Sequence, residues 1–396
     1  MEPSITSEAP DASSYLNSIT PVESRTNELA VQFTGSGSEY FRIWIVNLLL
    51  MLVSLGIYYP WAKVRRLRYF YGNTVVDGAP LDFHGEPRKM LRGYALTGVL
   101  IALYSTAGNF SPLAGLAAFL IIAVLWPALF KSSMQFRLAN TSWRGLRFRF
   151  KGTLAGAYRA MVPLFVPGAA LLAMVAFEAP GQRPSTAYAV ASGAELVVIV
   201  LAAPWLWWNL KSYQHNHYAF GQQQTELRST VAAFYGVFFK TLGVLALGAL
   251  AIGLVFGVLG GGMALFHGRQ GPAALAGAIL GVFVGFLFVQ FGVRPYFTSR
   301  MQNLLWSRTG NSSLRFRSEL NFLPLMGLML KNWLLMALTL GLYGPFAAVA
   351  LARMRLQAIS ITTRVNPDSL VDQARAHEGE AAGDAAGDLL GPDIGL

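Results

Sequence analysis

The sequence predicts an all-α membrane protein, a polytopic helical bundle of about six to eight membrane segments with internal repeats and short cytoplasmic β-hairpins. Hydrophobic residues make up 54% of the 396-residue chain and charged residues only 13%, whereas about a quarter of the residues in a typical soluble protein are charged. Several apolar runs approach the ~20 residues that a spanning helix needs. Basic and nearly uncharged connections alternate between these runs, as expected where Lys and Arg stay in the cytoplasm.

The apolar segments predict three helical hairpins that enter the membrane from the cytoplasm and return to it. The connections near 105–112, 178–186 and 266–271 are short, and Arg183 and Arg269 are their only basic residues. The other connections are longer and rich in Lys and Arg, so we assign them to the cytoplasmic side. The predicted segments are 41–59, 92–108, 113–130, 158–177, 187–208, 232–260, 272–293 and 322–346.

Acidic ends flank this basic membrane domain. The net charge of the whole chain is +11, yet residues 1–40 contain six acidic residues and one basic residue. Residues 365–396 contain seven acidic residues and one basic residue. Such polar, charged segments cannot bury enough apolar surface to fold alone. We therefore predict disordered tails at 1–32 and 363–396 around a membrane domain at 33–362.

Internal repeats link the basic connections. The pattern Pro60, Asn73-Thr74 recurs sixty-seven positions later as Pro127, Asn140-Thr141. A further shift of seventy-seven positions maps Tyr158 onto Tyr235. Each repeat reads as an apolar helix, a proline, an amphipathic stretch, a turn and a short strand-like segment.

Short β-hairpins are predicted at the ends of these repeats. Residues 146–149 alternate Leu-Arg-Phe-Arg, and residues 314–317 repeat the same four letters. Alternation with period two is typical of a half-buried strand. We place these strands on the cytoplasmic surface.

The two end segments share a motif that complicates the topology. Leu55-Gly56-Ile57-Tyr58 matches Leu340-Gly341-Leu342-Tyr343. If both segments cross the membrane, the alternation of sides makes them run in opposite directions. Either the repeat is inverted, as in some transporters, or both segments are re-entrant hairpins that turn at this motif. Lys331 and Asn332 in the last segment and Asn47 in the first favour re-entrant hairpins, because a charge at the bilayer centre is costly.

Four polar residues inside apolar segments are candidate intramembrane sites. An intramembrane carboxylate such as Glu195 is a functional hypothesis by default, and the alternative is that Glu195 lies at the outer mouth of its helix. The other candidates are Lys331, Asn47 and Asn332. His215 and His217 would share a metal only on a strand, and we expect them to be interfacial polar residues instead.

Glycines spaced four residues apart predict close helix packing. Small residues at this spacing let membrane helices approach one another, either within the chain or between subunits. The residues are Gly253, Gly257, Gly277, Gly281 and Gly285.

Residues 31–95 resemble the YjgN family of bacterial multi-pass inner-membrane proteins, which are built on a domain of unknown function. The resemblance is densest in the motif that contains Gly56, Tyr58, Pro60, Trp61, Arg65, Asn73 and Thr74. It recurs more loosely to about residue 360. The resemblance implies an inner-membrane location and a multi-pass fold, and it implies no activity. It also suggests a membrane metallopeptidase as a partner.

Two classes of function follow from these observations. A transporter or channel for a small solute or lipid is supported by the repeats, the prolines at 163 and 167, and Glu195. A non-transporting membrane scaffold, or a partner of an envelope enzyme, is supported by the sparse intramembrane charge. We expect no enzyme activity and no cofactor, because no acid–base or metal constellation stands out. The expected partners are anionic lipid headgroups, a second copy of the chain and a membrane metallopeptidase, with no nucleic acid.

Overall fold

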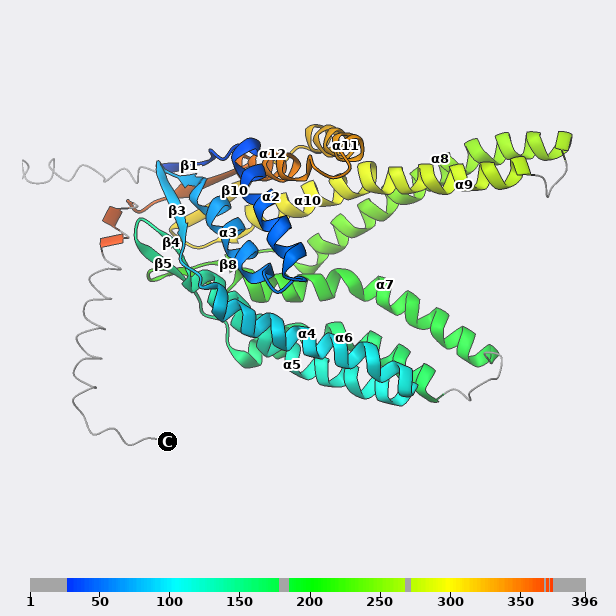
Figure 1. Ribbon diagram of the computed structural model, residues 1–396, viewed down its shortest axis with the longest axis horizontal. Coiled ribbons are helices and arrows are strands. Elements are labelled where there is room, and N and C mark those ends of the chain that lie inside the picture. Colours follow the sequence, from blue (N-terminus) through cyan, green and yellow to red (C-terminus); the bar gives the residue numbers. More distant parts are fainter. Residues whose placement is uncertain (1–26, 178–184, 268–271, 367, 370, 373–396) are drawn as a thin grey trace, which may run out of the picture.

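The computed structural model describes residues 27–177, 185–267, 272–366, 368–369 and 371–372, with the side chains of 258–274 left out (Figure 1). Within this part, the chain repeats one unit of strand, helical hairpin and strand. The first unit is β1 (Asn27–Phe33), α2 (Gly37–Val53), α3 (Tyr59–Gly72) and β2 (Thr74–Val76). The second is β3 (Ala79–Phe83), α4 (Pro87–Phe110), α5 (Pro112–Ala139) and β4 (Thr141–Trp143).

Three more units follow. The third is β5 (Leu146–Phe150), α6 (Leu154–Phe177), α7 (Thr186–His215) and β6 (Tyr218–Phe220), with β7 (Gln223–Gln224) after it. The fourth is β8 (Glu226–Leu227), α8 (Val231–His267), α9 (Pro272–Phe288), the π-helix η1 (Val289–Val293), α10 (Arg294–Ser307) and β9 (Thr309–Gly310). The fifth is β10 (Leu314–Ser318), α11 (Phe322–Leu338), α12 (Gly344–Gln357) and β11 (Ile359–Thr363).

The strands join into one 11-stranded sheet that nearly closes on itself. Its order is β7-β6-β5-β4-β3-β2-β1-β11-β10-β9-β8, so the first strand pairs with the last. The two ends of this order, β7 and β8, are separated in the chain by Thr225 alone. The expectation of an all-α protein is therefore wrong. Strands of two to seven residues give weak local signals, and their pairing over long sequence distances is not visible in the periodicity.

Two-residue turns build the β-hairpins that join the first unit to the second and the second to the third. The β2–β3 turn has positive φ at Asp77 (49°) and Gly78 (73°), and the β4–β5 turn repeats this at Arg144 (49°) and Gly145 (82°). Two successive positive φ angles mark the type I′ turn, whose twist matches that of the strands. An ion pair of 2.6 Å between Arg144 Nη2 and Asp77 Oδ2 joins the two turns. The predicted short β-hairpins are confirmed.

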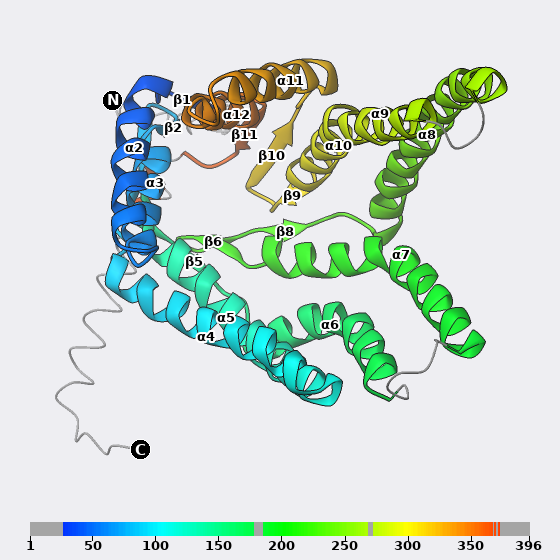
Figure 2. The same ribbon diagram turned by 45° about the vertical axis from the view of Figure 1, so that its right-hand side comes forward.

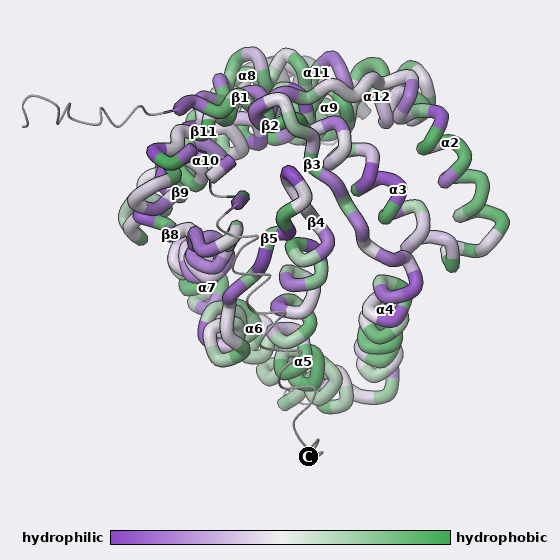
Figure 3. Tube along the Cα trace, turned by 90° about the vertical axis from the view of Figure 1, so that its left-hand side faces the viewer, coloured by the Kyte–Doolittle hydropathy of each residue, from purple (hydrophilic) through white to green (hydrophobic). Residues whose placement is uncertain are grey.

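The helical hairpins form a ring rather than a bundle. The second helix of each unit packs against the first helix of the next, in the pairs α3–α4, α5–α6, α7–α8, α10–α11 and α12–α2. The hairpins extend away from the strands (Figure 2). Hydrophobic residues dominate the helices, and hydrophilic residues gather at the strands (Figure 3).

Five described helices are long and apolar enough to cross a membrane, which is fewer than the six to eight segments expected. They are α5, α6, α7, residues 231–257 of α8 and the continuous run 275–307 through α9, η1 and α10. Helix α4 packs along α5 and has 24 residues. Arg88, Lys89 and Arg92 in its first turns reduce its mean hydropathy. Each of the three predicted long hairpins is present as a packed helix pair.

The two end segments fold back on themselves. Helices α2 and α3 pack together, and so do α11 and α12. Strands β1 and β2, which flank the first pair, are hydrogen-bonded neighbours, and β10 and β11 flank the last pair in the same way. Each hairpin therefore leaves the sheet along its first helix and returns to it along its second, as a re-entrant segment requires.

The predicted boundaries of the tails need correction. Residues 27–32, which we placed in the N-terminal tail, form most of β1 and pair with β2 and β11. The pairing supplies the backbone partners that an isolated polar segment lacks. At the other end, Asp368 forms an ion pair with Arg144. The predicted tail residues 1–26 and 373–396 lie outside the described residues.

Several residues of the family motif stabilise the ends of helices. Asn73 Nδ2 donates to the Tyr69 carbonyl at 2.8 Å, and Asn140 Nδ2 donates to the Phe136 carbonyl at 2.8 Å. His217 occupies the same place in the third unit, with Nδ1 at 2.7 Å from the Tyr213 carbonyl. These side chains bond to carbonyls of the last helical turn, where backbone donors become scarce.

The rest of the motif shapes the first hairpin. Gly56 has a φ of 89° in the α2–α3 turn. The Tyr58 and Trp61 rings stack with centroids 5.9 Å apart, and the Arg65 guanidinium lies 5.7 Å from the Tyr58 ring. Pro60 is fully buried. The motif residues therefore support turns and helix ends.

Candidate functional site

A buried proline interrupts the second helix of the third unit. Pro204 lies inside α7 and has no amide hydrogen to donate. The Tyr235 hydroxyl, from α8, donates to the Leu201 carbonyl just before this proline at 2.7 Å. The preceding unit repeats the arrangement, since Tyr158 donates to the Val124 carbonyl before Pro127 at 2.8 Å. A tyrosine thus holds each helix pair together where a proline disturbs the backbone.

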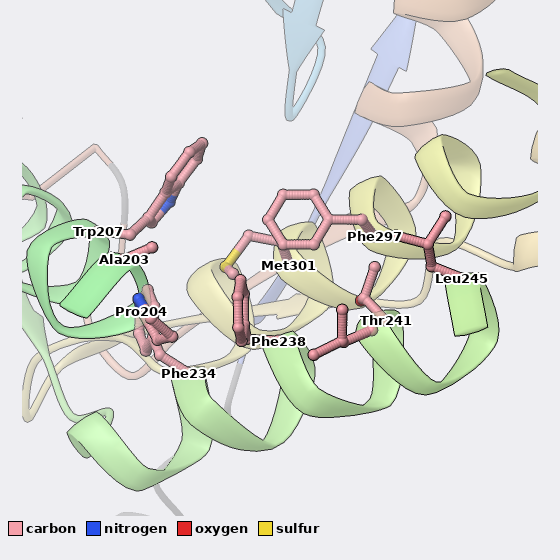
Figure 4. Close-up of a pocket in the computed structure, with 10 residues that line it drawn as sticks. Ala203, Pro204, Trp207, Phe234, Phe238, Thr241, Leu245, Phe297 and Met301 are labelled. Atoms are coloured by element: carbon pink, nitrogen blue, oxygen red, sulfur yellow. The ribbon is translucent and has the colours of Figure 1, made fainter. Parts of the chain in front are cut away.

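A cavity of about 310 Å³ lies beside Pro204, between α7, α8 and α10 (Figure 4). Its volume is at the lower end of the range for ligand pockets, roughly 300–1,000 Å³. Thr241 carries the one side-chain hydroxyl in the lining, and the other lining side chains are apolar apart from the indole nitrogen of Trp207. The lining residues are Ala203, Pro204, Trp207, Phe234, Phe238, Thr241, Leu242, Leu245, Phe297 and Met301.

The cavity is closed toward the strands and open toward the outside. Phe234 is 1% exposed and packs with Met301 and Leu305 at the end nearer the sheet. In contrast, Trp207 is 44% exposed and Leu242 is 40% exposed. The mouth therefore lies at exposed side chains of helices that are long and apolar enough to cross a membrane.

A second helix irregularity borders the cavity. The π-helix η1 ends at Val293, and Phe297 lies in the first turns of α10 that follow. The Phe297 ring meets the Trp207 ring edge to face, with centroids 5.8 Å apart. Single π-turns inside α-helices often occur at functional sites. The cavity thus lies between a proline-interrupted helix and a helix with a π-turn.

The sequence predictions missed this cavity, although the repeat contained a signal for it. The shift of seventy-seven positions maps Trp126 onto Ala203 and Phe130 onto Trp207. In the second unit, Trp126 and Phe130 pack against a buried cluster that contains Met161. An indole is therefore replaced by a methyl group at the same place in the next unit, and a cavity results.

The predicted polar candidates do not come together. Glu195 lies in α7, Asn47 in α2, and Lys331 and Asn332 in α11. Asn47 Oδ1 accepts from Arg65 at 3.5 Å, and Asn332 Nδ2 donates to the Ala347 carbonyl at 3.5 Å. Lys331 is exposed. Each asparagine thus ties the first helix of an end hairpin to the second.

Glu195 is the exception among them. It is 8% exposed, and neither carboxylate oxygen has a hydrogen-bond partner among the described residues. Eighteen residues separate Glu195 from Tyr213, which is five helical turns, so both project from the same side of α7. Tyr213 packs against Ala157 and donates to the Thr153 carbonyl at the start of α6. By this spacing Glu195 lies on the side of α7 that packs against α6, and it is not among the residues that line the cavity.

His215 and His217 make structural contacts near the strands of the sheet. His215 Nδ1 lies 2.9 Å from Thr309 Oγ1, and His217 caps its own helix. Among the described residues, no group of three or more His, Cys, Asp or Glu side chains could hold a metal ion. The expectation that these histidines are not metal ligands remains a prediction.

The glycine positions show little close packing within the chain. A Cβ atom on Gly281 would lie 3.4 Å from the Phe256 ring, whereas one on Gly253, Gly257, Gly277 or Gly285 would meet no atom of the described residues within 4 Å. Among the glycines with described surroundings, the closest contact between α8 and α9 is instead at Gly248, where a Cβ atom would lie 2.1 Å from Phe288. A contact between subunits at the open glycines remains a prediction.

The chain is similar to known proteins over about a third of its length. Three curated relatives are each named inner membrane protein YjgN. The protein from Salmonella typhimurium is 30% identical over 133 residues, which is 33% of this chain and 34% of the relative. The proteins from Escherichia coli O157:H7 and K12 are each 30% identical over 141 residues. The chain thus aligns with about a third of the length of these relatives.

No solved structure matches the chain. The model of a bacterial protein family of unknown function, DUF898, matches residues 28–389, which is most of the chain. The match includes all five units of the strand ring. With its apolar helices, the chain is a membrane protein that belongs to the DUF898 family.

Proposed function

We propose that this protein binds a membrane lipid through the cavity between α7, α8 and α10 and acts in lipid handling at the inner membrane. The observation that supports this most is the apolar lining, which includes one hydroxyl group and no charged side chain. Such a surface suits a hydrocarbon chain and does not suit an ion or a sugar, because a polar solute would lose its hydrogen bonds there.

The volume and position of the cavity suit one part of a lipid molecule, its acyl chain. At about 310 Å³ it holds a segment of one acyl chain and not a whole lipid. Its mouth lies at the exposed Trp207 and Leu242, and in this proposal an acyl chain enters there sideways from the bilayer. The rings of Trp207 and Phe297 meet at the cavity and would close over such a chain.

Photocrosslinking tests this proposal. The purified protein in vesicles would be irradiated with a phosphatidylethanolamine that carries a diazirine on one acyl chain, and the modified peptides identified by mass spectrometry. We expect crosslinks on α7 near Trp207 and on α8 near Phe238. Ala203→Trp places an indole where the second unit has one, and it should reduce these crosslinks by at least about tenfold.

A matched control adds the same side chain elsewhere on α7. Val197→Trp adds an indole at a lipid-exposed position, and it should leave the crosslinks near Trp207 unchanged. Equal crosslinking of the wild type and Ala203→Trp at these peptides would contradict the proposal.

A membrane scaffold is the second candidate, and the fourth hairpin favours it. None of the side chains in the apolar windows of α8 and α9 is buried within the described chain. A hairpin with two lipid-facing sides offers a surface for a partner such as a second copy or an envelope metallopeptidase. Copurification in mild detergent followed by mass spectrometry tests this role.

A further inference from the structure

The two end hairpins have the same turn, and its side chains are unusually exposed and apolar. Leu55 at the α2–α3 turn is 93% exposed, and Leu340 at the α11–α12 turn is 94% exposed. Both have a φ of 49°, and the glycines that follow have φ of 89° and 91°. The neighbouring Leu52, Val53, Ile57, Leu338 and Leu342 are also exposed.

The backbone of each turn, in contrast, leaves no amide without a partner. In the first turn, residues 54 to 59 all donate their amide hydrogens within the turn, for example Gly56 to the Met51 carbonyl at 2.8 Å and Tyr58 to Ser54 Oγ at 3.0 Å. The last turn repeats the pattern, with Gly341 donating to the Met336 carbonyl at 2.7 Å and Tyr343 to Thr339 Oγ1 at 3.0 Å.

Exposed apolar side chains together with internally bonded backbone amides suit a hydrocarbon environment and not water. Backbone inside a bilayer must satisfy its polar groups internally, because no water is available to bond to them. A surface loop in water has no such requirement, and seven exposed large apolar side chains at two turn tips would be unfavourable there. The Ser54 and Thr339 hydroxyl oxygens accept the amide hydrogens of Tyr58 and Tyr343, so these two amides have partners inside the turn.

Charged residues limit how deep the turns can reach. Lys63 lies in the second turn of α3, roughly 6 Å along the helix from its start, and Lys331 lies about 10 Å before the end of α11. Lysine side chains can extend toward the headgroups, but a charge at the bilayer centre is costly. Half of the hydrocarbon core is about 15 Å thick. The tips therefore fit near the middle of the bilayer.

We infer that the first and last hairpins form a monotopic insertion whose tips contact the acyl-chain ends of the opposite leaflet. The two hairpins are neighbours, because α12 packs against α2. In this arrangement the first and last hairpins reach from the strands to about the middle of the bilayer. The hairpins on the side of α5, α6 and α7 cross the whole bilayer. Lipids of the opposite leaflet lie over the low side. The inference does not depend on lipid binding in the cavity.

Single cysteines test this insertion directly, because the chain has no native cysteine. Leu55→Cys and Leu340→Cys mark the two short tips, and Phe110→Cys marks the tip of the long α4–α5 hairpin, where Phe110 is 86% exposed. We expect a membrane-impermeant maleimide to label Phe110→Cys in intact cells. It should label neither short tip in intact cells nor in inverted membrane vesicles.

A depth measurement separates burial in lipid from burial in protein. A bimane on Leu55→Cys or Leu340→Cys should be quenched several-fold more by lipids brominated near the chain ends than by lipids brominated near the headgroups. Labelling of either short tip from the periplasmic or cytoplasmic side, or stronger quenching near the headgroups, would overturn the inference. Ile57→Cys and Leu342→Cys serve as second variants if the first fail to accumulate.

Discussion

The α5–α6 pair and the α7–α8 pair are the same interface built twice, and only one of them is filled. In both pairs a tyrosine of the second member donates to a carbonyl just before a buried proline of the first. In the α5–α6 pair, Trp126, Leu164 and Phe165 pack against the buried cluster. Their counterparts seventy-seven positions later are Ala203, Thr241 and Leu242, which line the cavity.

This difference teaches that the cavity is not a consequence of the repeat. The architecture supplies the proline, the tyrosine and the ring contact in both units, and the closed pair demonstrates that they permit dense packing. The opening arises where larger side chains are replaced by smaller ones, and the largest of these changes is from Trp126 to Ala203. Packing defects of this kind cost several kcal/mol when they stay empty, which favours an occupant over a void.

The largest expected effect is that of opening the filled interface. Trp126→Ala copies Ala203 into the second unit and should lower the free energy of unfolding by about 3–5 kcal/mol. Chemical denaturation in detergent micelles would measure it. Trp205→Ala is the control, because Trp205 is 40% exposed and its loss should cost far less. Equal losses for the two variants would mean that the α5–α6 pair is not densely packed in solution.

A smaller gain is expected at Glu195. Its counterpart seventy-seven positions earlier is the buried Ala118. Because neither oxygen of Glu195 has a hydrogen-bond partner among the described residues, Glu195→Leu should raise the free energy of unfolding by about 1–3 kcal/mol. Thermal unfolding followed by intrinsic fluorescence measures this gain. An unchanged or lower unfolding temperature would indicate that the carboxyl group has a partner in the membrane.

A loss of about 1–3 kcal/mol is expected at Asn209. Pro163 leaves the Arg159 carbonyl without its helical donor, and Asn209 Nδ2 donates to that carbonyl at 3.0 Å. Asn209→Leu would leave the carbonyl without this partner. The same denaturation experiment tests it, with Asn209→Ser as a control that retains a donor. If Asn209→Leu is as stable as the wild type, this bond does not hold α7 to α6.

The smallest effects are expected at the two tyrosines. Tyr158→Phe and Tyr235→Phe each remove one hydroxyl that donates to a carbonyl, so each should cost about 1 kcal/mol. Hydrogen exchange at the amides around Pro127 and Pro204 would report the local loss. A clearly larger effect at Tyr235 would mean that this tyrosine also controls the cavity.

Much of this arrangement was predictable from the sequence. The three long hairpins followed from apolar length, and the β-hairpins from alternation at Leu146 and Leu314. Ring closure was not predictable, because β1 and β11 pair across more than 300 residues and their short strands have no distinct local signature. The cavity depends on a few replacements between the repeats, chiefly that of Trp126 by Ala203. Comparison of the repeats position by position would have found it, and apolar periodicity could not.

The pairing of the first strand with the last has a consequence for biosynthesis. Until Ile359–Thr363 has been synthesised, β1 and β10 each keep an unpaired edge, and open strand edges invite pairing with other chains. The amino-terminal unit must therefore wait for the carboxyl-terminal one, and closure of the ring is a late step of folding. A ribosome that stalls before residue 359 would release a chain with two unpaired strand edges, suited to aggregation or to quality-control proteolysis.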